Sequence, residues 1–276
     1  MQVAARGLTF DVRVAGPDAA RGTVLLLHGF PQHSGMWDGV TPALHAAGYR
    51  TVAPDQRGYS PGARPSEVDA YDLAELSADA LAILDALAVH GPVHLVGHDW
   101  GAMVGWRLAA EHADRLATWT AVSVPHPGAM ARALLTDSDQ RSRSKYIVLF
   151  RIAGKAEDVL LADGGSKLRR IFTGSGLSPE GVASFVDPLL EPGALTGALN
   201  WYRALPRTGY RVKSTTVPTT FVWSDGDLAI GAKAARGCGR YVDADYRFVV
   251  LEGVTHWIAD QCPDELAQAI LARVDA

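Results

Sequence analysis

The stretch HLVGHDWGAMVGW, which runs from His94 to Trp106, contains the turn that decides the fold. It begins as a strand-like apolar run, passes through a turn of small residues and continues as a helix-like segment. Asp99 stands at the centre of the turn, between Gly97 and Gly101. Glycines at these positions permit a strained strand-to-helix turn that projects the central side chain above the edge of a sheet. The pattern therefore predicts a functional carboxylate at Asp99.

Strand-like and helix-like segments alternate along most of the chain. Short apolar runs such as TVLLLHG and RTVAPD are typical of strands buried on both faces. Expected strands lie at 8–16, 23–29, 50–55, 92–97, 116–125, 219–224 and 246–253, and expected helices at 37–49, 73–87, 100–112 and 263–274. This alternation predicts an α/β fold, with a mostly parallel central sheet and helices on both of its faces.

The alternation breaks between His126 and Tyr210. No clear buried strand occurs there, and the segment is helical in character, with Gly- and Pro-rich breaks such as TGSGLSPEG. The strand–helix rhythm then returns. The simplest interpretation is an α/β core formed by residues 1–125 and 211–276, interrupted by a helical lid at 126–210.

The composition is that of a globular protein. The 276 residues are 48% hydrophobic and 20% charged, with a net charge of −4, and the chain is long enough to bury a large core. We expect no nucleic-acid partner, because there is no basic footprint, and no membrane partner, because no apolar run approaches spanning length. The first residues enter a strand pattern without a secretory apolar region, so we expect a cytoplasmic protein, either a monomer or a homodimer.

Neither the cysteines nor the histidines form a metal-type motif. Cys238 and Cys262 lie far apart in the sequence, which predicts two reduced thiols. The regularly spaced histidines from His90 to His98 are interrupted by a Gly-Pro pair that breaks any shared helix. We expect no metal site and no cofactor.

Three further motifs follow predicted strands, as the aspartate turn does. HGFP (His28–Pro31) follows the first buried strand, WSDGDLAIG brings Asp227 after the first strand beyond the lid, and VTHWI brings His256 after the last strand. With Asp99 they give the order nucleophile, acid, histidine. With these motifs, and with DQRGYS at 55–60, the chain resembles the α/β-hydrolases and most closely the epoxide hydrolases. The resemblance covers nearly the whole chain and is weakest in the lid.

An aspartate at the turn narrows the chemistry. A carboxylate is already ionised, so Asp99 can displace directly at an sp³ carbon and form an alkyl ester. The resemblance implies that His256, oriented by Asp227, then activates a water that hydrolyses this ester. Asp225 is the nearest competitor for the place of the acid. The expected substrate is a small apolar electrophile, and the second reactant is water.

The same resemblance implies an oxyanion hole and part of a substrate site. The donors of the hole are the backbone N–H groups of Phe30 and Trp100, and the Phe30–Pro31 peptide bond is expected to be cis. Pro31, Trp201 and Trp257 are expected beside the substrate.

Opening of an epoxide creates an alkoxide, and epoxide hydrolases supply its proton from two lid tyrosines. The stretch ALNWYRA resembles the segment that bears one of them and gives Tyr202. The stretch KYIVLFR departs from the pattern, because Leu149 aligns where the family has a tyrosine. Tyr146 lies three residues earlier, close to the same helical face, and is the available substitute. We expect both Tyr146 and Leu149 at the substrate site.

The leading hypothesis is an epoxide hydrolase that forms a vicinal diol through an ester on Asp99. A hydrolytic haloalkane or haloacid dehalogenase uses the same aspartate mechanism and stays open as an alternative, since Leu149 leaves one proton donor in question. A non-catalytic ligand-binding protein on the same scaffold is the third possibility. The complete set of nucleophile, acid and histidine argues against it.

Overall fold

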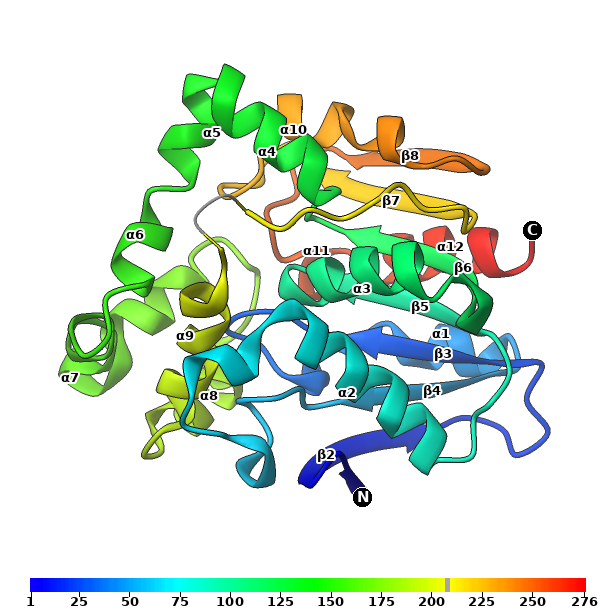
Figure 1. Ribbon diagram of the computed structural model, residues 1–276, viewed down its shortest axis with the longest axis horizontal. Coiled ribbons are helices and arrows are strands. Elements are labelled where there is room, and N and C mark those ends of the chain that lie inside the picture. The colour runs from blue at the N-terminus through cyan, green and yellow to red at the C-terminus, as the bar shows by residue number, and fades with distance from the viewer. Residues whose placement is uncertain (207–208) are drawn as a thin grey trace.

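A computed structural model describes residues 1–206 and 209–276 of the chain (Figure 1). Its centre is one sheet of eight strands in the order β1-β2-β4-β3-β5-β6-β7-β8. The strands are β1 (Gln2–Ala5), β2 (Leu8–Ala15), β3 (Gly22–Leu27), β4 (Tyr49–Pro54), β5 (Val93–His98), β6 (Leu116–Val122), β7 (Thr219–Ser224) and β8 (Tyr246–Leu251). Strand β2 pairs antiparallel with β1 and β4, and every pairing from β4 across to β8 is parallel. The predicted α/β class with a mostly parallel sheet is confirmed.

Helices cover both faces of the sheet, which explains why its central strands are continuous apolar runs. In Figure 1, α2 (Leu73–Ala86) and α3 (Trp100–Glu111) lie on one face, and α1 (Thr41–Ala46) and α12 (Pro263–Val274) lie on the other. All six residues of β7 are buried. The edge strand β8 instead has half-buried residues except at Arg247 and Val250, which are exposed.

Helix α2 follows the amphipathic pattern read from the sequence. Asp72 caps its first turn by accepting a hydrogen bond from the N–H of Ala74. Leu76, Ala80 and Ile83, at four- and three-residue steps, are buried against the core.

Six helices are described between β6 and β7 in the chain; α5 to α9 lie at the left of Figure 1, and α4 lies at its top beside α10 (Ala232–Arg236). They are α4 (Pro127–Thr136), α5 (Ser138–Arg143), α6 (Tyr146–Phe150), α7 (Lys155–Ile171), α8 (Pro179–Val186) and α9 (Ala194–Ala204). Within the described part of the segment no strand occurs. We keep 126–210 as the proposed lid; its residues 207 and 208 fall outside the described residues.

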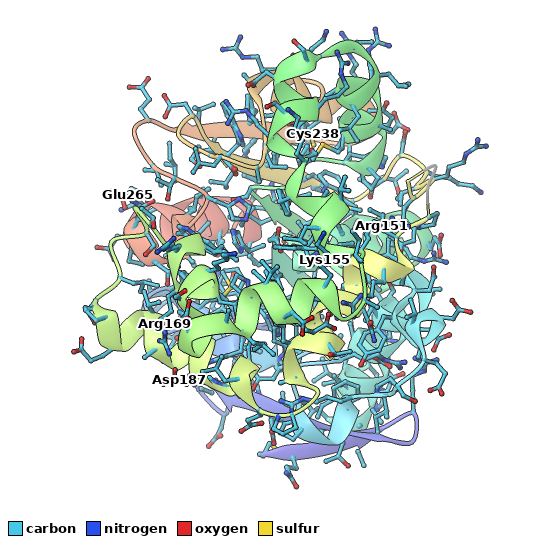
Figure 2. The ribbon with its side chains drawn as sticks, turned by 90° about the vertical axis from the view of Figure 1, so that its left-hand side faces the viewer. Arg151, Lys155, Arg169, Asp187, Cys238 and Glu265 are labelled. Carbon is cyan, nitrogen blue, oxygen red and sulfur yellow. The ribbon has the colours of Figure 1, made fainter. Side chains whose placement is uncertain are left out.

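Figure 2 turns the layer of helices at the left of Figure 1 toward the viewer. Lys155 begins α7 and Arg169 lies near its end, with non-helical backbone at 162–165 between them. Arg169 forms an ion pair with Asp187, the residue that follows α8 (Figure 2). This contact ties the end of α7 to the end of α8 on the outer side of the layer.

Some short elements differ from the sequence expectations. The helix expected at 37–49 is a 3-10 turn followed by the six-residue α1, because Pro42 in the first turn fixes where the helix begins. Strand β1 and the helices α10 (Ala232–Arg236) and α11 (Ile258–Gln261) were not expected, since four or five residues carry no readable period. The 3-10 turns are η1 (Ser34–Trp37), η2 (Pro61–Ala63), η3 (Val68–Tyr71), η4 (Ala113–Arg115), η5 (Asp187–Leu190) and η6 (Cys238–Tyr241).

Candidate active site

Asp99 stands at the turn between β5 and α3, at the carboxyl end of the parallel strands. Its backbone has φ 53° and ψ −118°, a strained conformation for a residue that carries a Cβ. A Cβ on Gly97 would lie 2.9 Å from the backbone N of Ala102, and a Cβ on Gly101 would lie 2.7 Å from the carbonyl oxygen of His28. Only glycine at these positions lets β5, α3 and the loop after β3 approach so closely.

The two carboxylate oxygens of Asp99 have different neighbours. Oδ1 accepts a 2.8 Å hydrogen bond from the N–H of Phe30, whereas Oδ2 lies 3.5 Å from Nε2 of His256. Burial favours the neutral form, but the hydrogen bond and charge of His256, assisted by the backbone of Trp100, outweigh it and lower the pKa of Asp99. Asp99 is therefore an ionised carboxylate at neutral pH.

His256 lies between two carboxylates. Its Nδ1 is 2.8 Å from Oδ2 of Asp227, and its Nε2 faces Asp99. Burial opposes protonation of the ring, but the charges and hydrogen bonds of Asp227 and Asp99 raise the pKa of His256 to about 10. His256 is therefore an imidazolium at neutral pH.

Asp227 is held in place by the loop that follows β7. Its Oδ1 accepts hydrogen bonds from the N–H groups of Ala229 at 2.7 Å and Ile230 at 3.0 Å, and its side chain is fully buried. Asp225, the competitor for this place in the sequence, lies elsewhere and accepts a 2.7 Å hydrogen bond from the N–H of Gly253. Of these two aspartates, Asp227 is the one that contacts the imidazole.

His98 supports His256 from behind. Its Nε2 donates to the carbonyl oxygen of His256 at 2.9 Å, and the two ring centroids are 4.7 Å apart. Burial, together with the charge of His256, lowers the pKa of His98 to about 4, so this ring stays neutral. The sequence analysis did not predict a role for His98. In the sequence, only its position next to Asp99 points to such a role.

The loop after β3 brings Phe30 to Asp99, and the Phe30–Pro31 bond is cis, as predicted. His28 braces the loop: its Nε2 accepts from the N–H of Gln56 at 3.0 Å, and Nε2 of Gln56 donates to the His28 carbonyl at 2.6 Å. Burial lowers the pKa of His28 to about 4, which keeps the ring able to accept. The motifs HGFP and DQRGYS are therefore in contact. The sequence analysis predicted no role for His28 or for Gln56.

Two cavities meet at Asp99. The first, of about 380 Å³, extends beneath α4 and α6, and its apolar walls include Met103, Val124, Met130 and Leu134. The second cavity, of about 290 Å³, lies on the side of His256, and its walls include Phe30, Phe150, Ile171, Leu228 and Trp257. Both are lined by Asp99, Tyr146, Tyr202 and Ala229. The carboxylate therefore faces a mostly apolar space that extends to two sides of it.

Two lid tyrosines share this junction with Asp99. Tyr146 begins α6 and Tyr202 lies in α9, and their ring centroids are 6.2 Å apart in a T-shaped arrangement. Tyr202 is buried, which raises its pKa well above the ordinary value of a phenol, and the charge of Asp99 raises it further. Tyr146 keeps 37% of its surface exposed; the desolvation of its buried part and the charges of Asp99 and Asp227 raise its pKa as well. Both side chains are therefore O–H donors throughout the physiological pH range.

Leu149 requires a correction. It is half-buried and packs against the core, and it lines neither of the two cavities that reach Asp99 in the described parts of the chain. Tyr146, Ile147 and Phe150 form the face of α6 that lines these cavities, with the spacing of one helical face, and Leu149 lies off that face. The tyrosine of this helix comes about one turn earlier than the resemblance implied.

Trp257 and Trp201 were both expected beside the substrate, but only Trp257 lines one of the two cavities at Asp99. Trp257 lines the second cavity and stacks on Phe172, with centroids 4.6 Å apart. Trp201 lines neither cavity; it is buried and donates from Nε1 to the carbonyl oxygen of Arg57 at 2.9 Å. Trp201 and Tyr202 are consecutive in a helix and point about 100° apart, so only one of them can face Asp99.

Pro31, the third of these expectations, is buried in the loop after β3 and also lines neither cavity. Its neighbour Phe30 lies in the wall of the second cavity instead. In the described residues no group of three His, Cys, Asp or Glu side chains could hold a metal ion. Among the described helices, none has the length and apolar character needed to cross a membrane.

Comparison with known proteins agrees with this architecture. A family model described as the alpha/beta hydrolase fold matches residues 22–261. The chain belongs to the α/β-hydrolase family.

The similar proteins indicate to which part of the α/β-hydrolase family the chain is related. Epoxide hydrolase A of Mycobacterium tuberculosis is 33% identical, over 96% of this chain and 94% of its own, and the AB hydrolase superfamily protein YfhM of Bacillus subtilis is 31% identical over the same shares. A solved structure of Epoxide Hydrolase A from Mycobacterium thermoresistibile is 27% identical and superposes with a TM-score of 0.85, over 99% of this chain and 96% of that one. Within the family, the chain is epoxide hydrolase-like.

Proposed function

We propose that this protein is an epoxide hydrolase that opens an epoxide to a vicinal diol through a covalent alkyl ester on Asp99. The observation that carries the proposal is the junction at which Tyr146 and Tyr202 face the ionised Asp99 across a mostly apolar space. An epoxide needs both partners: a nucleophile on its carbon and a proton donor on its oxygen. A halide needs no proton to leave, so the phenol pair supports an epoxide over a haloalkane.

In the first half-reaction, Oδ2 of Asp99 attacks one epoxide carbon. Oδ1 is already engaged by the N–H of Phe30 and becomes the carbonyl oxygen of the ester. The epoxide C–O bond breaks, and its electron pair stays on oxygen as an alkoxide that accepts a hydrogen bond from Tyr146 and Tyr202. These donors are held in position before the reaction, which lowers the barrier.

Formation of the ester changes the charge around His256. One of the two carboxylates that raise its pKa becomes neutral, so the imidazolium becomes a stronger acid. Its proton passes to the alkoxide, directly or through the tyrosines, and gives the free hydroxyl of the hydroxy-ester. His256 is left neutral and becomes a base, with Asp227 still on its Nδ1.

In the second half-reaction, neutral His256 takes a proton from water as the oxygen of this water adds to the Asp99 carbonyl carbon. Negative charge develops on Oδ1, where the N–H groups of Phe30 and Trp100 stabilise it. The ester C–O bond then breaks, the second hydroxyl leaves with a proton, and the remaining proton restores the Asp99–His256 ion pair. Epoxide and water are consumed, and one diol is formed.

The volumes and walls of the two cavities indicate the size and polarity of the substrate. Their volumes of about 380 and 290 Å³ lie on two sides of Asp99, and their walls are predominantly apolar. We infer a small to medium apolar epoxide that carries a substituent on each ring carbon, one for each cavity. The lid segment 126–210 supplies most of the walls of the larger cavity and both phenols.

The proposal is tested with the variant His256→Gln, which should form the ester but not hydrolyse it. The variant is exposed to trans-1-phenylpropylene oxide and, separately, to 1-chlorohexane, and its intact mass is measured. We expect an adduct equal to one whole epoxide, mapped by peptide analysis to Asp99. An adduct equal to the haloalkane less hydrogen halide would assign a dehalogenase. No adduct on a folded variant would instead support a binding protein without turnover.

A further inference from the structure

The loop that carries the acid is held by the lid. Residues 227–231 lead from Asp227 to Gly231, the residue before α10, and pass beside α5 of the lid segment. Helix α5 packs against α4 at the top of Figure 1, and α4 in turn packs against α10. A part of the catalytic core therefore depends on an element from the inserted segment.

Gln140 makes most of this contact. Its side chain is completely buried; Oε1 accepts from the N–H of Gly231 at 2.8 Å, and Nε2 donates to the carbonyl oxygen of Ala229 at 2.8 Å. Nε2 also donates to Oγ of Ser144 at 3.1 Å. A buried amide with all these partners is well satisfied, and it fixes two peptide groups of the acid loop at once.

Arg143 holds the other end of the loop. Its Nη1 donates to the carbonyl oxygen of Asp227, and its Nε makes a 2.7 Å ion pair with Asp139, one turn earlier in α5. The backbone from Asp227 to Gly231 is thus bonded to α5 at three points. The carboxylate itself accepts from Ala229 and Ile230, which are peptide groups of the same held loop.

We propose that Gln140 and Arg143 are positioning residues, through which α5 of the lid holds the loop 227–231 so that Asp227 keeps its contact with His256. The effect on the reaction rests on the proposed function, whereas the effect on the imidazole does not. Without the two side chains the loop loses three hydrogen bonds from α5, and the 2.8 Å contact between Asp227 and His256 lengthens.

The proposal predicts a change in the pKa of His256. The charged and titratable groups that face this ring are Asp99 and His98 at the end of β5 and Asp227 after β7, and Tyr146, Arg170 and Tyr202 line the same cavity as the ring. Of these only Asp227 lies on the held loop. A looser Asp227 therefore lowers the pKa of His256, since less negative charge and a weaker hydrogen bond stabilise the imidazolium.

The experiment compares Gln140→Leu with the unmodified protein by NMR titration of the His256 imidazole. Leucine keeps the volume and removes both contacts to the loop without a change of charge. We expect the pKa of His256 to fall by about one unit. An unchanged pKa in a variant with the native thermal transition would overturn the proposal.

Arg143→Met is the second variant, and here the direction of the shift in the pKa of His256 tests the proposal independently. Loss of a nearby cation by itself raises the pKa of His256, whereas loss of positioning lowers it. A fall supports the proposal and a rise overturns it. Arg143→Lys, which keeps the charge and one donor, should restore most of the shift. Arg141→Met is the matched control, because Arg141 lies in the same helix but, among the described residues, donates only to the carbonyls of Leu134 and Leu135.

The kinetic readout separates this proposal from the proposed function. With an epoxide, Gln140→Leu should slow hydrolysis of the Asp99 ester at least tenfold and leave its formation within about twofold, so that the ester accumulates in the intact mass. The rising limb of the pH profile for ester hydrolysis should move to lower pH. A shifted His256 pKa with no ester from any epoxide would contradict the proposed reaction and still support the positioning role. Equal slowing of both half-reactions would overturn it.

Discussion

The N–H of Phe30 donates to Oδ1 of Asp99, while Oδ2 of the same carboxylate faces His256. The two oxygens are therefore not equivalent before any substrate binds. One lies where negative charge develops during ester hydrolysis, and the other is placed to attack.

This relationship predicts the fate of labelled oxygen. In a single turnover in ¹⁸O-water, the diol should carry no label, because its new oxygen comes from Asp99 and the water oxygen enters the carboxylate. Mass spectrometry of the diol and of the peptide containing Asp99 measures both. A labelled diol after one turnover would mean that water attacks the epoxide directly and that no ester forms.

The phenol pair predicts a large effect at Tyr146 and Tyr202 and a small one at Leu149, which shares α6 with Tyr146. Tyr146→Phe and Tyr202→Phe should each slow ester formation by about 100-fold, because the alkoxide loses a positioned donor. Leu149→Ala should leave the rate within about threefold, since Leu149 lines neither cavity. Stopped-flow measurement of ester formation checks all three. A large effect at Leu149 and none at Tyr146 would reverse the assignment.

The geometry around His256 distinguishes two nearby aspartates. Asp227→Asn should slow ester hydrolysis by at least about 100-fold, because the neutral amide no longer stabilises the imidazolium that forms. Asp225→Asn should keep full turnover and cost about 1 kcal/mol of stability, through a weaker hydrogen bond to Gly253. Turnover and the free energy of unfolding are measured on both variants. Comparable loss of turnover in both would argue against Asp227 as the only acid.

Asp260 predicts a pH dependence of stability. Burial raises the pKa of Asp260 from 3.8 to about 6, against a 2.8 Å hydrogen bond from Nε2 of Gln32. A carboxyl whose folded pKa is raised is protonated more readily in the folded state, so its ionisation lowers stability as the pH rises from 3.8 to about 6. Asp260→Asn should therefore raise the free energy of unfolding at pH 7.5, by about 1–2 kcal/mol, and change it little at pH 4.

The side chain of Gln32 strengthens this prediction. Its Oε1 is buried without a hydrogen-bond partner in the described structure, and the amide introduced by Asp260→Asn would offer a donor to it. Urea unfolding at the two pH values gives the comparison. Equal stabilisation at both would show that the amide contact, and not the ionisation of Asp260, causes the change.

The core was predictable because its signals are local. The apolar run of β3, the glycines around Asp99 and the motifs after β7 and β8 can be read in the sequence, and the carboxyl ends of parallel strands must meet at one edge. The rotation of α6 could not be read. This helix has five residues, and whether Tyr146 or Leu149 faces Asp99 depends on its packing against α9.

The choice between Asp225 and Asp227 also required three dimensions. Both follow β7 within three residues, and either could serve as a carboxylate near a histidine. The turn that brings the N–H groups of Ala229 and Ile230 onto Asp227 decides it. The contact of Gln140 with this turn joins segments 91 residues apart, and no pattern in the sequence announces it.

The unequal cavities on two sides of Asp99 have a stereochemical consequence. A substrate with two different substituents fits in two orientations, and each presents a different ring carbon to Oδ2. Displacement inverts the carbon that is attacked, so the orientation determines the handedness of the diol. In the proposed reaction, the apolar side chains of α4, together with Ile147 of α6, help to set the larger volume and thereby select between mirror-image products, without contact with the breaking bond.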